Sequence, residues 1–130
     1  MGEELYVAGE GKSTLKSKSF AFAIQVVRLY QRLVEIREYV LSKQLLRSAT
    51  GVGALIREAQ NAESKRDFIH KLGIAQKECD ESIYWLELML KTEYLTRKEF
   101  DLLNQQAVEI LRMLRSAIIT SKKNLGTYRL

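Results

Sequence analysis

Hydrophobic residues recur every three or four positions, the spacing of one helix face, over four long segments of the chain. The segments cover about residues 19–41, 43–61, 65–91 and 97–122. The stripe predicted for the first consists of Phe20, Ala23, Val27, Tyr30 and Val34, with Val26, Leu33 and Val40 beside it. The other three consist of Leu45, Ala49, Val52, Ile56 and Ala59; of Phe68, Leu72, Ala75, Cys79, Ile83, Leu86 and Leu90; and of Leu103, Ala107, Ile110, Leu114 and Ala117 or Ile118. No segment alternates as a strand does, so the pattern predicts an all-α fold.

Two of the predicted helices begin with side chains that can accept hydrogen bonds from free backbone N–H groups. Ser64 with Asp67, and Thr96 with Glu99, have the spacing of a capping box. The connections between helices are short, and short connections make neighbouring helices antiparallel. We therefore expect an up-down-up-down four-helix bundle over residues 15–122, with 1–14 and 123–130 as flexible tails.

Composition agrees with long helices in a reducing compartment. Prolines are absent, 46% of residues are hydrophobic, and Cys79 is the single cysteine. The first residues lack a basic segment followed by an apolar run, and no apolar run is long enough to span a membrane. We expect a soluble, cytoplasmic protein that does not contact membranes.

Several apolar residues lie off the primary stripes, and this pattern predicts a homo-oligomer. They are Tyr39, Leu55, Ile69, Ile74, Trp85, Leu88 and Met113. The alternative is a monomer with a few scattered exposed apolar residues, which is normal. Gly51 and Gly53 lie within the second helix, where glycine is unfavourable, and predict the close approach of another helix.

The net charge of +5 is concentrated at particular helix ends. Residues 11–34 and 110–130 contain basic residues and no acid. In an up-down-up-down bundle these regions and the start of the third helix share one end, which should attract RNA, DNA or another polyanion. The residues predicted to contact it are Lys12, Lys16, Lys18, Lys65, Arg66, Lys122 and Lys123. Part of the pattern needs no ligand, since cations complement the carboxyl end of the fourth helix.

The stretch VAGEGKST, residues 7–14, resembles a phosphate-binding loop, but Tyr6 stands where that motif requires its first glycine. A di-iron bundle is not expected, because His70 is the only histidine. Cys79 lies on an apolar stripe about 13 Å along the helix from His70, so the two cannot form a catalytic pair. We expect no enzyme activity, no metal and no cofactor.

The run from Tyr39 to Met89 carries four distinctive stretches: LLRSATGVGA, EAQNAESKRDFIHKL, IAQKECDES and YWLELM. In these the chain resembles bacterial four-helix bundle proteins related to those encoded in intervening sequences of large-subunit rRNA genes. The resemblance extends over nearly all of the chain except its two tails. It implies a left-handed antiparallel bundle assembled as a homopentameric ring, with a poorly defined biochemical role.

A related branch comprises the accessory proteins of diversity-generating retroelements, which are basic pentamers that bind reverse transcriptase and nucleic acid. The resemblance therefore leaves two functions open: RNA or polyanion binding through the basic end, and a scaffold for a protein such as a reverse transcriptase. The chain departs from the family pattern at Gly51, where serine is typical, and at Leu55, where asparagine is typical. Five residues on family-typical positions are interpreted as a structural polar network: Arg47, Glu58, Lys71, Glu78 and Glu81.

Overall fold

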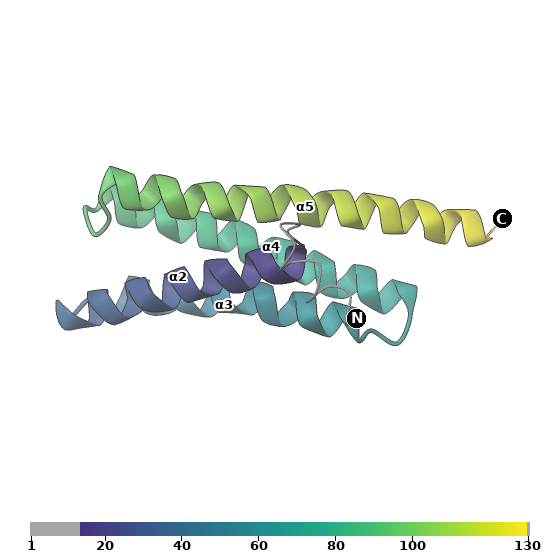
Figure 1. Ribbon diagram of the computed structural model, residues 1–130, viewed down its shortest axis with the longest axis horizontal. Coiled ribbons are helices and arrows are strands. Elements are labelled where there is room, and N and C mark those ends of the chain that lie inside the picture. Colours follow the sequence, from purple (N-terminus) through teal and green to yellow (C-terminus); the bar gives the residue numbers. More distant parts are fainter. Residues whose placement is uncertain (1–13, 130) are drawn as a thin grey trace.

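The chain folds as four helices joined by short turns, with no strand among residues 14–129 (Figure 1). The structure, a computed structural model, describes the backbone of these residues and the side chains of residues 14–125. The helices are α2 (Leu15–Glu35), α3 (Val40–Gln60), α4 (Lys65–Lys91) and α5 (Arg97–Arg129). The prediction of an all-α fold with four helices is confirmed.

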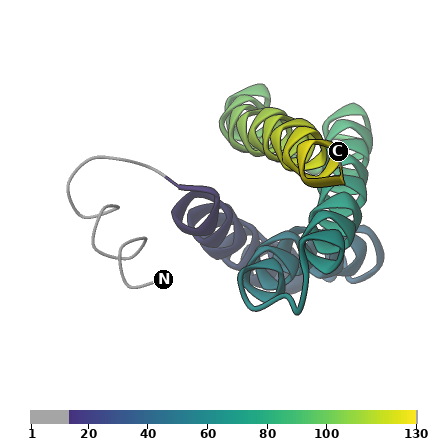
Figure 2. The same ribbon diagram turned by 90° about the vertical axis from the view of Figure 1, so that its right-hand side faces the viewer.

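Each helix packs against the one before it, and α5 returns to lie beside α2. In Figure 1, α2 runs from right to left, α3 returns, α4 runs to the left again and α5 returns. Seen from the end in Figure 2, the helices follow one another around a shared core, with the first and last in the least extensive contact. The seam between α2 and α5 is therefore the most open side of the bundle.

Side chains accept hydrogen bonds at the starts of α2, α4 and α5. The capping box predicted for Thr96 and Glu99 is confirmed in both directions. At Ser64 only one of its two bonds forms: Ser64 accepts from Asp67 N at 3.0 Å, whereas the Asp67 carboxylate accepts from Glu63 N. A further capping box joins Thr14 and Ser17, with the Ser17 N–H donating to Thr14 Oγ1 at 3.1 Å. The first helix therefore begins at Leu15 and not near residue 19 as predicted.

The boundary between α2 and α3 also differs from the prediction, which continued the first helix to residue 41 and began the second at 43. Arg37 adopts a left-handed conformation with φ of 66° and ends α2 without a glycine. Glu38 then starts α3: its carboxylate accepts hydrogen bonds from the N–H groups of Val40, Leu41 and Ser42 at 2.7–3.1 Å. These three bonds satisfy N–H groups that the first turn of a helix leaves free.

The last helix is longer than the sequence predicted, because α5 continues to Arg129 instead of ending at residue 122. Nothing in residues 123–129 interrupts a helix as a proline would, and cations near a helix carboxyl end are favourable. The tail predicted for residues 123–130 is thus largely helical. The predicted N-terminal tail lies outside the described residues except for Thr14, which caps α2.

The stripe of α2 that faces the core is not the predicted one. Its buried residues are Ser19, Phe22, Val26, Leu29 and Leu33. By contrast, Phe20 is 55% and Val27 is 36% exposed. A Cβ atom added to Gly53 would lie 3.6 Å from the carbonyl oxygen of Ser19, an ordinary van der Waals distance, so α2 and α3 pack directly against each other here. Ser19 faces this contact, whereas Phe20 and Val27 of the predicted stripe lie outside.

The other helices bury the residues that their patterns predict. Leu45, Ala49, Val52, Ile56 and Ala59 of α3 are at most 2% exposed, and Leu103, Ala107, Ile110 and Leu114 of α5 are also buried. In α4 the stripe is buried at Leu72, Ala75, Cys79 and Leu86 and half-buried at Phe68, Ile83 and Leu90. Within the described residues, no helix has the length and apolar character to cross a bilayer.

Candidate nucleic-acid interface

The starts of α2 and α4 and the end of α5 lie toward the same end of the molecule, on the right in Figure 1. We call this region the basic end. The described cations that the sequence assigned to it are Lys16, Lys18, Lys65, Arg66, Lys122 and Lys123. Lys12, which was also assigned to it, lies outside the described residues.

The cations of the basic end differ in their surroundings. The ammonium group of Lys18 forms an ion pair with Glu109 at 2.9 Å, so its charge is already partly balanced. The Lys65 ammonium group lies 5.8 Å from the centre of the Phe68 ring, within the range of a cation–π interaction. Lys65 is nevertheless exposed. Arg66 and Lys122 are exposed, whereas Lys16 is half-buried beside a cleft.

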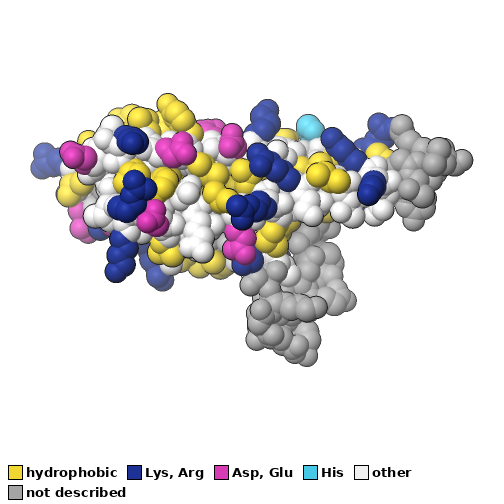
Figure 3. All heavy atoms as spheres, turned by 90° about the horizontal axis from the view of Figure 1, so that it is seen from above, with side chains coloured by type: hydrophobic (Ala, Val, Ile, Leu, Met, Phe, Trp, Pro, Cys, Tyr) yellow, Lys and Arg dark blue, Asp and Glu magenta, His cyan; other side chains and the backbone are white. Residues whose placement is uncertain are grey.

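The last part of α5 contributes positive charge without any acidic residue. Arg112, Arg115, Lys122 and Lys123 follow Glu109, which is the last acid of the chain. In Figure 3 the right-hand part of the visible face carries dark blue basic groups, whereas the magenta acidic groups lie over the middle and left. A surface with clustered charge of one sign generally attracts ligands of the opposite charge.

Nearby acids make local contacts of their own. Glu58 pairs with Lys71 at 3.4 Å, and Asp67 accepts a weak bond from the Glu63 N–H at 3.3 Å. The opposite end carries mixed charges, with Arg32 paired to Glu99. The charge asymmetry therefore comes from the number of cations at one end and not from strong acidity at the other.

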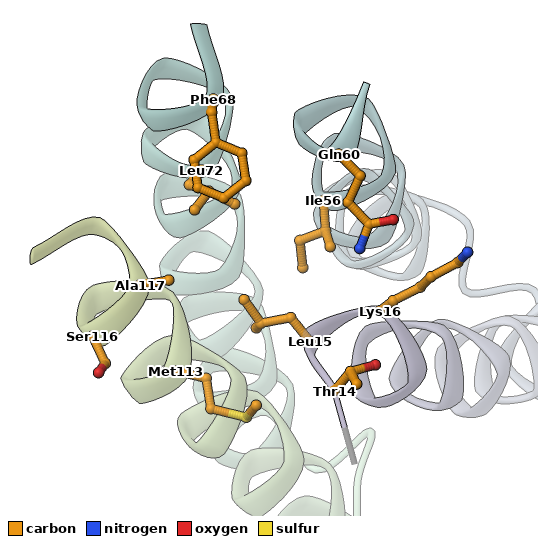
Figure 4. Close-up of a pocket in the computed structure, with 10 residues that line it drawn as sticks. All are labelled: Thr14, Leu15, Lys16, Ile56, Gln60, Phe68, Leu72, Met113, Ser116 and Ala117. Atoms are coloured by element: carbon orange, nitrogen blue, oxygen red, sulfur yellow. The ribbon is translucent and has the colours of Figure 1, made fainter. Parts of the chain in front are cut away.

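An apolar cleft of about 450 Å³ opens beside Lys16. Figure 4 shows the side chains of Leu15, Ile56 and Met113 directed toward the space between the helices. Phe68 and Leu72 of α4 form another wall, and Gln60 lies near the rim with Lys16. Charged groups and an apolar hollow thus adjoin each other at the basic end.

The five residues interpreted as a polar network form two separate clusters. Arg47 on α3 donates to Glu78 at 3.1 Å and to Glu81 on α4, and Glu81 also accepts from the Trp85 indole N–H at 2.9 Å. The second cluster is the pair of Glu58 and Lys71. Both clusters join α3 to α4, but the structure does not bring them together.

The surroundings of the Arg47 cluster favour the charged forms of its members. The hydrogen bond from Trp85 lowers the pKa of Glu81, burial opposes this, and the bond to Arg47 lowers it further. The pKa of Arg47 is raised chiefly by its hydrogen bond to Glu81. The arrangement is a stable ion pair with no group prepared to transfer a proton.

Cys79 has the environment of a structural thiol. It is fully buried, donates to the Ala107 carbonyl at 3.2 Å, and burial raises its pKa to about 12. A thiol with such a pKa forms very little thiolate at neutral pH. Among residues 14–129, no three His, Cys, Asp or Glu side chains gather in a way that could hold a metal ion.

The sequence prediction of the site left out arginines of the same region. Arg115 is exposed on α5, and Arg57 lies with its guanidinium carbon 5.5 Å from the centre of the Phe20 ring. The acid-free run after Glu109 was sufficient to identify Arg115. The contact of Arg57 with Phe20 depends on the rotation of α2 about its axis, which the hydrophobic pattern did not predict.

Comparison with known proteins places this geometry in a family. No curated protein matches the chain. A crystal structure of a protein of unknown function, from the S23 ribosomal protein family of Bacteroides thetaiotaomicron, is similar over 81% of this chain and 98% of that one. The two share 51% sequence identity, with a TM-score of 0.79. The family model described as 23S rRNA-intervening sequence protein matches residues 12–116. Since this match spans most of the chain, the chain belongs to the 23S rRNA-intervening sequence protein family.

Proposed function

We propose that this protein is a non-enzymatic helical bundle that binds structured RNA, or a similar polyanion, through its basic end. The observation that carries the proposal is that the starts of α2 and α4 lie beside the acid-free stretch of α5 that follows Glu109. The exposed cations Arg66, Arg115 and Lys122 contribute charge there. Family membership supports a connection with rRNA without specifying a contact.

Binding of this kind acts on phosphates and depends steeply on salt. Each phosphate that a cation neutralises releases counterions, so affinity falls as salt rises. With about four phosphate contacts, affinity should fall roughly 50- to 150-fold between about 50 and 200 mM salt. Among the described side chains, residues 14–125, the basic end offers no row of exposed aromatic rings, so we propose little dependence on base sequence.

The test compares two triple variants with equal changes in net charge, using a structured RNA and a salt series. Lys16→Glu, Lys65→Glu and Lys122→Glu together alter the basic end. Lysines 43, 91 and 98, all exposed near the opposite end, provide the matched control when changed to glutamate. Lys18 is left unchanged because glutamate at this position would place a second acid beside Glu109.

The first triple variant should bind far more weakly, with the salt slope reduced by about 1 for each lysine that contacts a phosphate. The control should retain most of the wild-type affinity. Equal losses in both variants would mean that only net charge matters. Binding that is absent, or independent of salt, would contradict the proposal.

We also propose that the helices form a left-handed antiparallel bundle and that five copies assemble as a ring. Ion pairs between Lys18 and Glu109 and between Arg32 and Glu99 support opposite directions for α2 and α5. The exposed rings and side chains on the outer face of α2, including Phe20 and Val27, support self-association.

Light scattering tests the assembly directly. The ring has five times the chain mass of 15.0 kDa, and Val27→Asp should lower the measured mass because it places a charge on the associating face. Ala21→Asp, at an exposed position of the same helix about 100° around its axis from Phe20, is the control. A wild-type monomer at micromolar concentration would refute the ring.

A second candidate function is a scaffold for another protein, such as a reverse transcriptase. It is favoured by an exposed apolar group at the α2–α3 turn, where Ile36, Tyr39 and Val40 are 62%, 51% and 72% exposed. Co-purification from the native host distinguishes the two functions. A protein partner lost on Val40→Asp supports the scaffold, and RNA lost in the basic-end variant supports polyanion binding.

A further inference from the structure

The helices of the bundle have unequal lengths, and this leaves the last part of α5 without α2 beside it. Leu15, the first residue of α2, lines the same cleft as Met113 of α5. Beyond Met113, α5 continues to Arg129, roughly 24 Å at the usual rise of about 1.5 Å per residue. Before Met113, one side of α5 packs against α2; after Met113, α2 no longer lies on that side. The cleft lies where α2 begins.

The cleft is predominantly apolar. Leu15, Ile56, Leu72, Met113 and Ala117 supply aliphatic or thioether surface, and Phe68 adds an aromatic ring. Its volume of about 450 Å³ lies within the roughly 300–1,000 Å³ typical of ligand clefts, so it can admit side chains of a short peptide segment. Apolar surface of this kind is stabilised when it is removed from water.

We propose that the cleft is occupied by the protein's own N-terminal segment, residues 1–13, with Leu5, Tyr6 and Val7 inserted between α2 and α5. The segment joins the described structure at Thr14, which itself lines the cleft. The eight residues from Tyr6 to Thr14 can span at most roughly 26–29 Å, which allows Tyr6 to reach any wall of the cleft.

The composition of the segment matches its site. Leu5, Tyr6, Val7 and Ala8 form an uninterrupted apolar run, and glutamates stand on both sides of it at positions 3, 4 and 10. The cleft pairs an apolar floor with Lys16 at its edge and the cations of the basic end nearby. An apolar run flanked by acids is therefore complementary to it in both polarity and charge.

The covalent connection favours this segment over a second copy of the chain. A short covalent connection gives an effective concentration in the millimolar range. At micromolar protein, a competing segment from another molecule needs an affinity about a thousand times higher to displace it. The chain's own segment therefore fills the cleft first.

The three methionines of the chain provide a direct test by NMR with ¹³C-methyl methionine. Met113 lines the cleft, whereas Met89 is fully buried in the core and serves as an internal control. In Tyr6→Ala the Met113 resonance should move by more than its linewidth, because the aromatic ring beside it is removed, and the Met89 resonance should stay in place. Tyr39→Ala removes an exposed ring at the opposite end of α2 and should move neither resonance.

A second variant, Val7→Asp, separates loss of the ring from loss of docking. It should bring the Met113 resonance close to its position in Tyr6→Ala, because a charged residue prevents insertion of the segment. A Met113 resonance that is the same in wild type, Tyr6→Ala and Val7→Asp overturns the proposal. A resonance that depends on protein concentration and not on Tyr6 overturns it in favour of a second copy.

Discussion

Glu38 holds the start of α3, and its replacement provides a stringent test of how the helices are delimited. Its side chain is 8% exposed and accepts hydrogen bonds from the N–H groups of Val40, Leu41 and Ser42. Glu38→Gln keeps the shape but removes the charge and turns an NH₂ group toward one of these donors. A buried N–H group then loses its acceptor.

Loss of a helix cap costs about 0.5–2 kcal/mol, and the buried position of Glu38 puts the expected loss near the upper value, about 2 kcal/mol. For a chain of this length that corresponds to a decrease in Tm of about 6–8 °C. Urea or thermal denaturation at pH 7 and fixed protein concentration measures it. Glu35→Gln, at an exposed position in the last turn of α2, is the control and should change stability by less than about 0.5 kcal/mol.

The contribution of Glu38 also has a defined pH dependence. Burial raises its pKa, but the hydrogen bonds to the start of α3 outweigh this and leave the pKa below the ordinary value of 4.5. A carboxylate whose pKa is lower in the folded state stabilises fully above the unfolded value and loses this effect as the pH falls through the folded value. The stability difference between wild type and Glu38→Gln should therefore shrink as the pH falls below 4.5. A small difference at pH 7, or one that does not change with pH, would refute the reasoning.

Three further predictions concern a glycine within α4, the buried cysteine and the tryptophan. Gly73→Ala should raise the free energy of unfolding by about 1 kcal/mol, because the added Cβ meets nothing within 4 Å in this chain; a loss of stability would indicate that another molecule packs there. Cys79 should react with a thiol reagent at pH 8 about a thousandfold more slowly than a free thiol, because its pKa is about 12; equal rates would disprove its burial. The fluorescence of Trp85, the only tryptophan, should titrate with a midpoint below 4.5 as Glu81 is protonated, and Glu81→Gln should abolish that transition.

Much of the fold was predictable because most helices carry one apolar stripe and recognisable caps. In α3 and α5 the predicted stripes are buried, and the capping pairs at Ser64 and Thr96 mark the starts of α4 and α5 correctly. The expected close contact at Gly53 is also present, against the backbone of Ser19. These features depend on local spacing and residue size, which a sequence states directly.

The α2–α3 boundary was mispredicted because the residues that form it are unusual for their roles. Helix ends with a left-handed residue commonly use glycine, but here Arg37 takes that conformation. The N–H groups of Glu38 and Arg37 donate to the carbonyls of Leu33 and Val34, which satisfies the end of α2. The glutamate side chain then caps α3 from a position where serine, threonine, aspartate or asparagine is usual.

The basic end was predictable as a sum of charges along the chain but not as a surface. The order of the helices is enough to bring Lys65 and Lys122 to one end. The pairing of Lys18 with Glu109 and the cleft beside Lys16 depend on the length and register of α2 against α5. Long-range register is set by packing, which the spacing of apolar residues does not specify.

The first helix shows why spacing alone cannot choose a core face. The stripe through Phe20 and Val27 and the stripe through Phe22 and Val26 have equally regular helical intervals, and both contain large apolar residues. Only one can face the bundle, and the serine on the second stripe matters because it lets α2 approach Gly53 closely. Phe20 and Val27 remain outside, with Arg57 over the Phe20 ring, so the same rotation that completes the core also creates the apolar surface on which the proposed self-association depends.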